Sequence, residues 1–127
     1  RGLGDVYKRQ AVLESGVKII LEETKLESFI KNADFVITGE GRLDGQTVMG
    51  KAPIGVAEIA KKYEKKVLAF GGCVAEDATL CNQYGIDAFF PILRTVTTLK
   101  EAMDFNHAKE NLSAAVEQVF RLIQSFK

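Results

Sequence analysis

Residues Phe35 to Lys51 read Phe-Val-Ile-Thr-Gly-Glu-Gly-Arg-Leu-Asp-Gly-Gln-Thr-Val-Met-Gly-Lys, and the rest of the chain is interpreted outward from them. The first four residues, 35–38, are apolar or β-branched, which predicts a buried strand. A loop of 13 residues, Gly39 to Lys51, is expected next, because it contains four glycines among polar side chains. Pro53 then stands where the first turn of a helix tolerates proline, so a strand, a long loop and a helix are predicted in this order.

Similar patterns continue on both sides of this stretch. Residues 17–21 have helical spacing, although 17–19 would equally suit a short strand. The sequence Gly71-Gly72 is expected to close the second strand, and Pro91 to stop the third. The remaining expected elements are strands at 66–70 and 87–90 and helices at 25–31, 53–62, 76–84, 97–103 and 106–126.

Strands that alternate with helices predict a parallel sheet covered on both faces. The expected fold class is therefore α/β, a three-layer, Rossmann-like, mostly parallel sheet with flanking helices, present as a partial domain. Ligands bind beyond the carboxyl ends of the strands in such sheets. The loop at 39–51 and the Gly71-Gly72 turn should both lie at those ends, on one shared rim.

The beginning of the chain differs from the rest. Residues 1–10 have no helical or strand period, and they lead abruptly into Ala11–Ser15, which is typical of the last turn of a helix. We expect 1–14 to be a disordered or non-native N-terminal segment, either a frayed terminus or foreign sequence in place of upstream chain, and 15–127 to be the α/β part.

Composition excludes several classes of protein. Of the 127 residues 46% are hydrophobic and 27% charged, as in a soluble globular protein. Seventeen Lys and Arg balance 17 Asp and Glu, which argues against a nucleic-acid partner. No apolar run approaches the roughly 18 residues of a membrane span, and the first ten residues lack a signal-peptide core. Cys73, Cys81 and His107 are too few for a zinc site or a disulfide framework, so a cytoplasmic location is expected.

Two nucleotide-binding motifs match the loop only in part. Gly39-x-Gly41-x-x-Asp44 begins like a dinucleotide fingerprint, but an aspartate stands in place of the third glycine, where a pyrophosphate would lie. The run from Gly45 to Gly50-Lys-Ala52 resembles a P-loop, but alanine replaces the Ser or Thr that would bind magnesium. Neither motif is therefore assigned.

A mixed set of polar side chains remains in the loop. Carboxylates can bind Mg²⁺ or accept a hydroxyl proton, and an arginine can bind a carboxylate or phosphate through two hydrogen bonds. Such a set would suit a polyol acid meeting a phosphoryl donor, whereas a solvated turn whose charges pair with each other is the plainer alternative. Its members are Glu40, Arg42, Asp44, Gln46, Thr47 and Lys51. Outside the loop, His107 is expected at the surface or at a helix cap, and Cys73 as a buried thiol or bystander.

A family resemblance covers about 15–127. The segments Ala33-Asp-Phe-Val-Ile-Thr-Gly-Glu-Gly-Arg-Leu-Asp-Gly-Gln-Thr47, Gly50-Lys-Ala-Pro53 and Gly55-Val-Ala57 resemble the bacterial type of the glycerate kinase family. Residues 67–72 and 84–88 and the closing helix are also similar. The matching part would be the C-terminal third of such an enzyme.

The resemblance implies a kinase that transfers the γ-phosphoryl group of ATP to a hydroxyl of D-glycerate, with ATP and Mg²⁺ as cofactors. It implies an active site between two domains, so the N-terminal part of the same enzyme would be a partner and this chain alone should be inactive. Asp44, Glu40 and Arg42 would be catalytic, with Glu40 and Asp44 also possible Mg²⁺ ligands. The expected substrate or phosphate contacts are Thr38, Gly39, Gly41, Gln46, Thr47 and Lys51. The rival hypothesis is a non-catalytic regulatory α/β domain that binds an anion or a nucleotide.

Overall fold

The computed structural model describes residues 16–127, so the expectations for 1–14 and for the helical turn at Ala11–Ser15 lie outside the described residues. Nine elements follow one another along the described chain. They are α2 (Gly16–Glu23), α3 (Leu26–Lys31), β1 (Phe35–Leu43), α4 (Ala52–Lys62), β2 (Lys66–Val74), the 3₁₀ helix η2 (Glu76–Tyr84), β3 (Ala88–Pro91), α5 (Leu99–Met103) and α6 (Phe105–Gln124).

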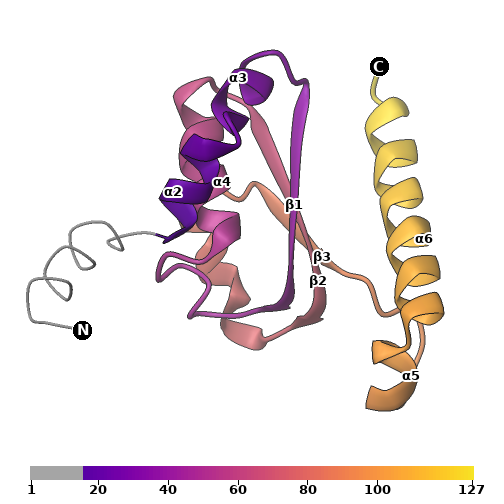
Figure 1. Ribbon diagram of the computed structural model, residues 1–127. Helices are drawn as coiled ribbons and strands as arrows, with labels where there is room; N and C mark the ends of the chain where they lie inside the picture. The colour runs from indigo at the N-terminus through magenta and orange to yellow at the C-terminus, as the bar shows by residue number, and fades with distance from the viewer. Residues whose placement is uncertain (1–15) are drawn as a thin grey trace, which may run out of the picture.

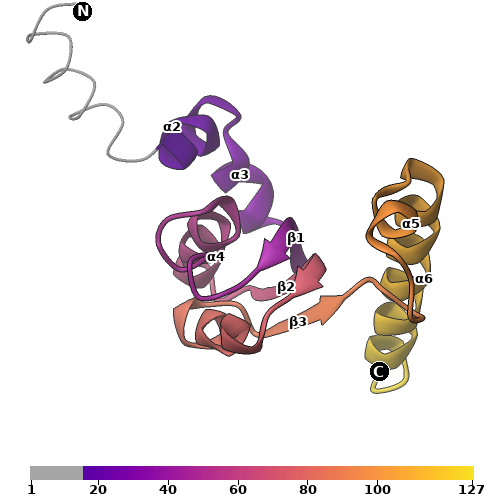
Figure 2. The ribbon, with the colours of Figure 1, turned by 90° about the horizontal axis from the view of Figure 1, so that it is seen from below.

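The three strands form a parallel sheet in the order β1-β2-β3. Helices α2, α3 and α4 lie on one side of this sheet, and α6 lies on the other (Figures 1 and 2). This arrangement confirms the predicted α/β class with a parallel sheet and flanking helices, as a small partial domain. None of the helices within 16–127 is long and apolar enough to cross a membrane.

Two apolar clusters hold the layers together. On the α4 side, Val36, Leu43 and Val67 pack with Ile54 and with further residues of α4 and η2. On the opposite side the cluster joins the sheet to α6, through Leu68, Phe70 and Val119. The sheet is thus covered on both faces, as the alternation of strands and helices predicted.

Two strands are longer than the sequence suggested. β1 continues past Thr38 to Leu43 and β2 continues past Phe70 to Val74, with Glu40 opposite Gly71. The expectation that loops begin at Gly39 and at Gly71 was therefore wrong, and the reason is steric. A Cβ atom added at Gly72 would lie 2.8 Å from the carbonyl oxygen of Gly41, closer than side chains come. These glycines allow the two strands to approach each other rather than to turn.

The remaining differences are small. Residues 17–19 belong to a helix, not to a strand, and 76–84 form a 3₁₀ helix rather than an α-helix. Thr98 caps α5, because its hydroxyl accepts a hydrogen bond from the Glu101 N–H at 3.2 Å. Gly85 ends η2 with φ of 100°, a conformation that favours glycine.

Candidate functional site

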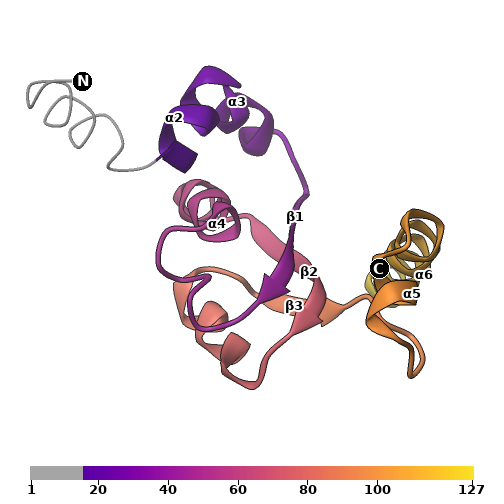
Figure 3. The same ribbon diagram turned by 60° about the horizontal axis from the view of Figure 1, so that its bottom comes forward.

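The candidate site lies at the carboxyl ends of β1 and β2. These ends run side by side, with Arg42 opposite Cys73, so the predicted shared rim is confirmed (Figure 3). β1 presents the first residues of the site, and a short loop at 44–51 leads from it to the N-terminus of α4. The rim is thus built from two strand ends and the start of one helix.

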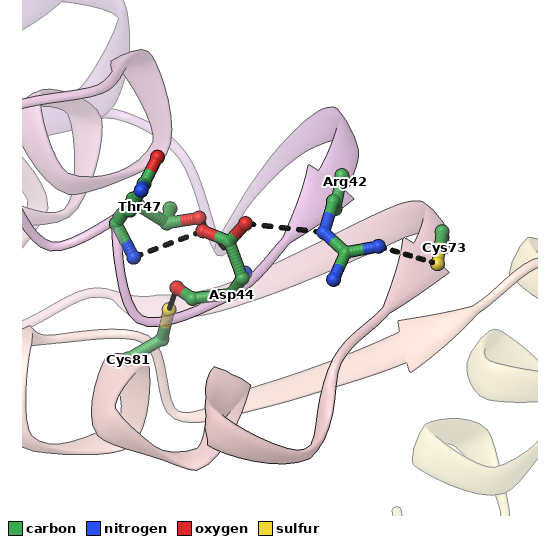
Figure 4. A network of polar contacts seen from close by, with 6 residues as sticks. Arg42, Asp44, Thr47, Cys73 and Cys81 are labelled. Atoms are coloured by element: carbon green, nitrogen blue, oxygen red, sulfur yellow. Dashed lines mark hydrogen bonds and ion pairs between the residues drawn. The ribbon is translucent and has the colours of Figure 1, made fainter.

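Asp44 organises the loop. Its Oδ1 accepts a hydrogen bond from the Gln46 N–H at 2.9 Å, and its Oδ2 accepts one from Arg42 Nε at 3.2 Å (Figure 4). The Thr47 hydroxyl accepts a hydrogen bond from the Asp44 N–H at 3.1 Å, and the Thr47 N–H donates to the Asp44 carbonyl at 3.1 Å. Both carboxylate oxygens of Asp44 are therefore engaged within the loop itself.

These contacts set the protonation state of Asp44. Burial acts to raise the pKa of its carboxyl group, whose side chain is only 16% exposed. Hydrogen bonds from the Gln46 N–H and Arg42, with the nearby charge of Lys51, outweigh burial and hold the pKa below its ordinary value. Asp44 is thus a stable carboxylate at neutral pH and a weak proton acceptor.

Arg42 is an exposed cation of the rim whose direction is fixed by its contacts. Its side chain is 61% exposed, although Nε is held by Asp44 and Nη1 donates to Cys73 Sγ at 3.6 Å. The guanidinium is therefore fixed in direction while most of its surface stays accessible. Cys73 is exposed, which corrects the expectation of a buried thiol. Sequence reasoning missed Cys73 as a residue of the rim, although its position two residues after Gly71 indicates it once β2 is known to continue to Val74.

Thr47 stabilises the loop from its buried side. Its side chain is fully buried, and its hydroxyl is used by the backbone of Asp44. The thiol of Cys81 lies 3.9 Å from the Asp44 carbonyl oxygen, and burial raises the pKa of that thiol. The Cys81 contact therefore joins the loop to η2, whereas Thr47 holds the loop together from within, and among residues 16–127 both side chains are buried.

The other predicted residues lie around the contacts that Asp44 makes with Arg42 and Thr47. Glu40 is half-buried near the end of β1, and Gln46 and Lys51 are exposed on the loop. Among residues 16–127, the side chains of Glu40 and Gln46 have no hydrogen bond or ion pair. Lys51 is the N-cap residue of α4, and its charge is close enough to Asp44 to help lower the pKa of that carboxyl group. The last members of the predicted set, Thr38, Gly39 and Gly41, also lie in β1.

Other candidate features do not belong to this site. Within the described residues, no group of three or more His, Cys, Asp or Glu could hold a metal ion. His107 is exposed, and its Nδ1 lies 3.0 Å from Oδ2 of Asp104, the residue that caps α6. This agrees with the predicted position at the surface or at a helix cap. A hollow of about 1040 Å³ between α2, α3 and α4 meets the loop only at Met49 and Gly50. We place the site at the rim because the paired charges lie there.

Comparison with known proteins gives a consistent result. Residues 2–124 match the model of the glycerate kinase family. The chain is 42% identical over 118 residues to a glycerate kinase of Bacillus subtilis, covering 93% of this chain and 30% of that protein. It is 43% identical over 109 residues to a glycerate 2-kinase of Escherichia coli, covering 86% of this chain and 28% of the relative.

A solved structure also resembles this one. A protein designated glycerate kinase 2 of Salmonella typhimurium LT2 aligns with a TM-score of 0.63 and 36% sequence identity. The alignment covers 87% of this chain and 26% of that crystallised chain. The present chain thus spans less than a third of the length of the relatives that it matches.

Proposed function

The chain belongs to the glycerate kinase family, and on that premise we propose that its rim forms part of the site at which a complete enzyme phosphorylates D-glycerate with ATP. One observation carries the proposal: Arg42 is held in a fixed direction by Asp44 and yet is 61% exposed. Phosphoryl transfer depends mostly on positioning and on neutralising negative charge. A fixed, accessible guanidinium at the carboxyl edge of a parallel sheet supports such a role.

The four charged residues take different parts in this proposal. Arg42 and Lys51 bind anionic groups, the phosphates of ATP or the carboxylate of glycerate. Asp44 keeps Arg42 in place, since both of its oxygens are engaged and its lowered pKa makes it a weak base. Glu40, which has no partner within 16–127, is then the better candidate to accept the proton of the glycerate hydroxyl.

Magnesium is the ion that this chemistry implies. Mg²⁺ in kinases usually binds one or two carboxylates together with phosphate oxygens and water, and it neutralises charge on the phosphates. Glu40 offers the one rim carboxylate without a competing partner within 16–127, so it would hold the ion only in an enzyme whose base comes from outside this chain, since a carboxylate bound to Mg²⁺ is a weaker base. Asp44 would have to give up a hydrogen bond to do so.

The test uses a joined enzyme, in which residues 16–127 replace the matching segment of the Bacillus subtilis glycerate kinase. The joined enzyme should form ADP only when glycerate and ATP are both present, whereas the 127-residue chain alone should form none. A joined enzyme that folds and binds ATP or phosphate without turnover would contradict the proposal and favour the regulatory domain. If the joined enzyme is active, separating its product as 2- or 3-phosphoglycerate would also identify the hydroxyl that reacts.

A further inference from the structure

The side chains of β1 and β2 do not keep one alternation along the whole strand. Val36 and Leu43 of β1 both belong to the apolar cluster on the α4 side, although they are an odd number of positions apart. Successive side chains of a strand point to opposite faces, so two such positions should lie on opposite faces. In β2, Ala69 belongs to the same cluster and Val74 packs against it, again an odd number of positions later. The alternation is therefore reversed once in each strand.

The reversal lies at the glycines near the carboxyl ends of the two strands. Phe70 still follows the earlier alternation, because it belongs to the cluster on the α6 side. The change in β2 therefore comes after Phe70, in a stretch that begins with Gly71 and Gly72. A Cβ atom at Gly72 would lie 2.8 Å from the carbonyl oxygen of Gly41, closer than side chains come. The strands can take this arrangement only because position 72 has no side chain.

The reversal decides which face Arg42 takes. Leu43, the next residue, is fully buried on the α4 side, so Arg42 points to the other face. Val74 packs on the α4 side as well, so Cys73 also points to the other face. Because Arg42 and Cys73 are directly opposite each other in the parallel pair, their side chains lie next to each other (Figure 4). Had the earlier alternation continued, Arg42 would point toward α4 instead.

Cys73 gives the guanidinium of Arg42 a second point of attachment. Arg42 Nη1 donates a hydrogen bond to Cys73 Sγ at 3.6 Å, while Arg42 Nε donates to Asp44. A guanidinium held by one hydrogen bond can still turn about that bond, whereas two bonds to different residues fix its plane. The two acceptors are independent, since Asp44 follows β1 and Cys73 belongs to β2. The N–H groups of Arg42 that neither acceptor uses remain for a ligand.

We propose that Cys73 is a positioning residue for Arg42, brought opposite it on the accessible face of the rim by the reversal at Gly41 and Gly72. Its thiol acts only through the guanidinium. Sulfur suits this part, because a neutral thiol is a weak acceptor that holds the cation without cancelling its charge, as a second carboxylate would. The consequence for catalysis rests on the proposed function, whereas the hold on Arg42 belongs to the fold of this chain.

The first test measures in the 127-residue chain how firmly Arg42 is held, and it needs no activity. NMR follows the exchange of the Arg42 Nε proton with water. Arg94, which is exposed and has no hydrogen bond or ion pair within 16–127, is the internal reference. The proton of Arg42 should exchange about tenfold more slowly than that of Arg94, because hydrogen bonding protects it. Cys73→Ala should raise the Arg42 rate about threefold, and Cys73→Ser, which keeps an acceptor, should restore the wild-type rate.

The second test uses the joined enzyme and asks whether Cys73 acts through Arg42. Cys73→Ala should lower kcat/KM by about fivefold, and Cys73→Ser by less than about twofold. In an Arg42→Ala background, Cys73→Ala should cause no further loss, because residues that act as one unit are not additive. An equal loss with and without Arg42 would overturn the proposal, and so would a Cys73→Ser variant as impaired as Cys73→Ala.

The glycine reversal has its own matched variants, compared in the 127-residue chain. Gly72→Ala places a Cβ atom 2.8 Å from a backbone oxygen, so the Arg42 Nε proton should exchange as fast as that of Arg94. At Gly41 a Cβ atom would meet nothing within 4 Å, so Gly41→Ala should leave the exchange rate unchanged. A folded Gly72→Ala chain with the wild-type rate would overturn the role of the reversal.

The remaining outcomes are also decisive. If Gly72→Ala does not fold, the Cys73 variants decide, because Cys73 is exposed and its substitution leaves the core intact. A wild-type exchange rate of the Arg42 Nε proton in Cys73→Ala overturns the proposal, whether or not the joined enzyme is active. An inactive joined enzyme, combined with the expected exchange rates, contradicts only the proposed function and supports Cys73 as the residue that holds Arg42.

Discussion

The two ends of the sheet carry nearly the same chemical arrangement. At the carboxyl end, Asp44 accepts hydrogen bonds from a backbone N–H at 2.9 Å and from Arg42 at 3.2 Å. At the amino end, Asp87 accepts them from the Val67 N–H at 2.7 Å and from Lys61 at 2.6 Å. In each case the pKa of the aspartate lies below its ordinary value, because these bonds outweigh the effect of burial.

The two pairs differ in what they connect. Asp44 joins residues within a single stretch, 42–47, and leaves a cation that is 61% exposed. Asp87 precedes β3, and it joins Lys61 of α4 to Val67, the second residue of β2. The side chain of Lys61 is only 38% exposed. We conclude that the same pair serves different purposes at the two ends. At the carboxyl end it presents a charge, and at the amino end it ties elements together.

The largest expected effect is on activity at the carboxyl end. In the joined enzyme, Arg42→Ala should lower kcat/KM by about 100-fold or more, since it removes a fixed cation from the proposed phosphoryl-transfer site. Lys61→Ala, the matched change at the amino end, should leave kcat/KM within about twofold. Steady-state kinetics with glycerate and ATP measure both. Similar losses of kcat/KM in Arg42→Ala and Lys61→Ala would contradict the distinction between the Arg42–Asp44 and Lys61–Asp87 pairs.

Stability should show the reverse order. Asp87→Ala leaves the Val67 N–H, in a fully buried residue, without its acceptor, and should lower the free energy of unfolding by about 1 to 2 kcal/mol. Asp87→Asn keeps an acceptor oxygen and should cost less. Chemical denaturation of the 127-residue chain compares them, with Asp44→Ala as the control from the other end. A larger loss for Asp44→Ala would contradict the comparison.

The sequence predicted the elements well and the rim less well. The strand at 35–38 and the helix at 53–62 follow from apolar runs and from proline, which act locally. The extension of β1 could not be predicted in this way, because Gly39 and Glu40 pair with β2 only through contacts between strands distant in sequence. Pairing of the loop charges was expected only as the plainer alternative, and Arg42 and Asp44 do pair. That Asp44 uses both oxygens inside the loop depends on backbone geometry that the composition of the loop does not show.

A smaller effect separates a positioning aspartate from a general base. In the joined enzyme, Asp44→Asn should lower kcat/KM by roughly tenfold, because a loosened Arg42 is less well placed. Combined with Arg42→Ala it should cause little further loss, since the two residues act as one unit. Fully additive losses, or a loss of about 100-fold or more in kcat alone, would return Asp44 to the role of base. Glu40→Gln, measured in parallel, should show the loss typical of a general base, about 100-fold or more.

The smallest effect concerns pH. The pKa of Asp87 is lowered in the folded chain, so its ionised form stabilises the fold above the ordinary value of 3.8, and this contribution is lost as the pH falls through the folded pKa. Asp44 has the same sign of shift and should contribute in the same pH range. The free energy of unfolding should therefore fall more steeply below about pH 4 in the wild type than in Asp87→Asn. Denaturation curves between about pH 3 and 6 measure the two slopes. Asp87→Asn and Asp44→Asn should each flatten the slope, because each removes a carboxyl group whose pKa is lower in the folded than in the unfolded chain, and a wild-type slope in either variant would contradict the shift at that end of the sheet.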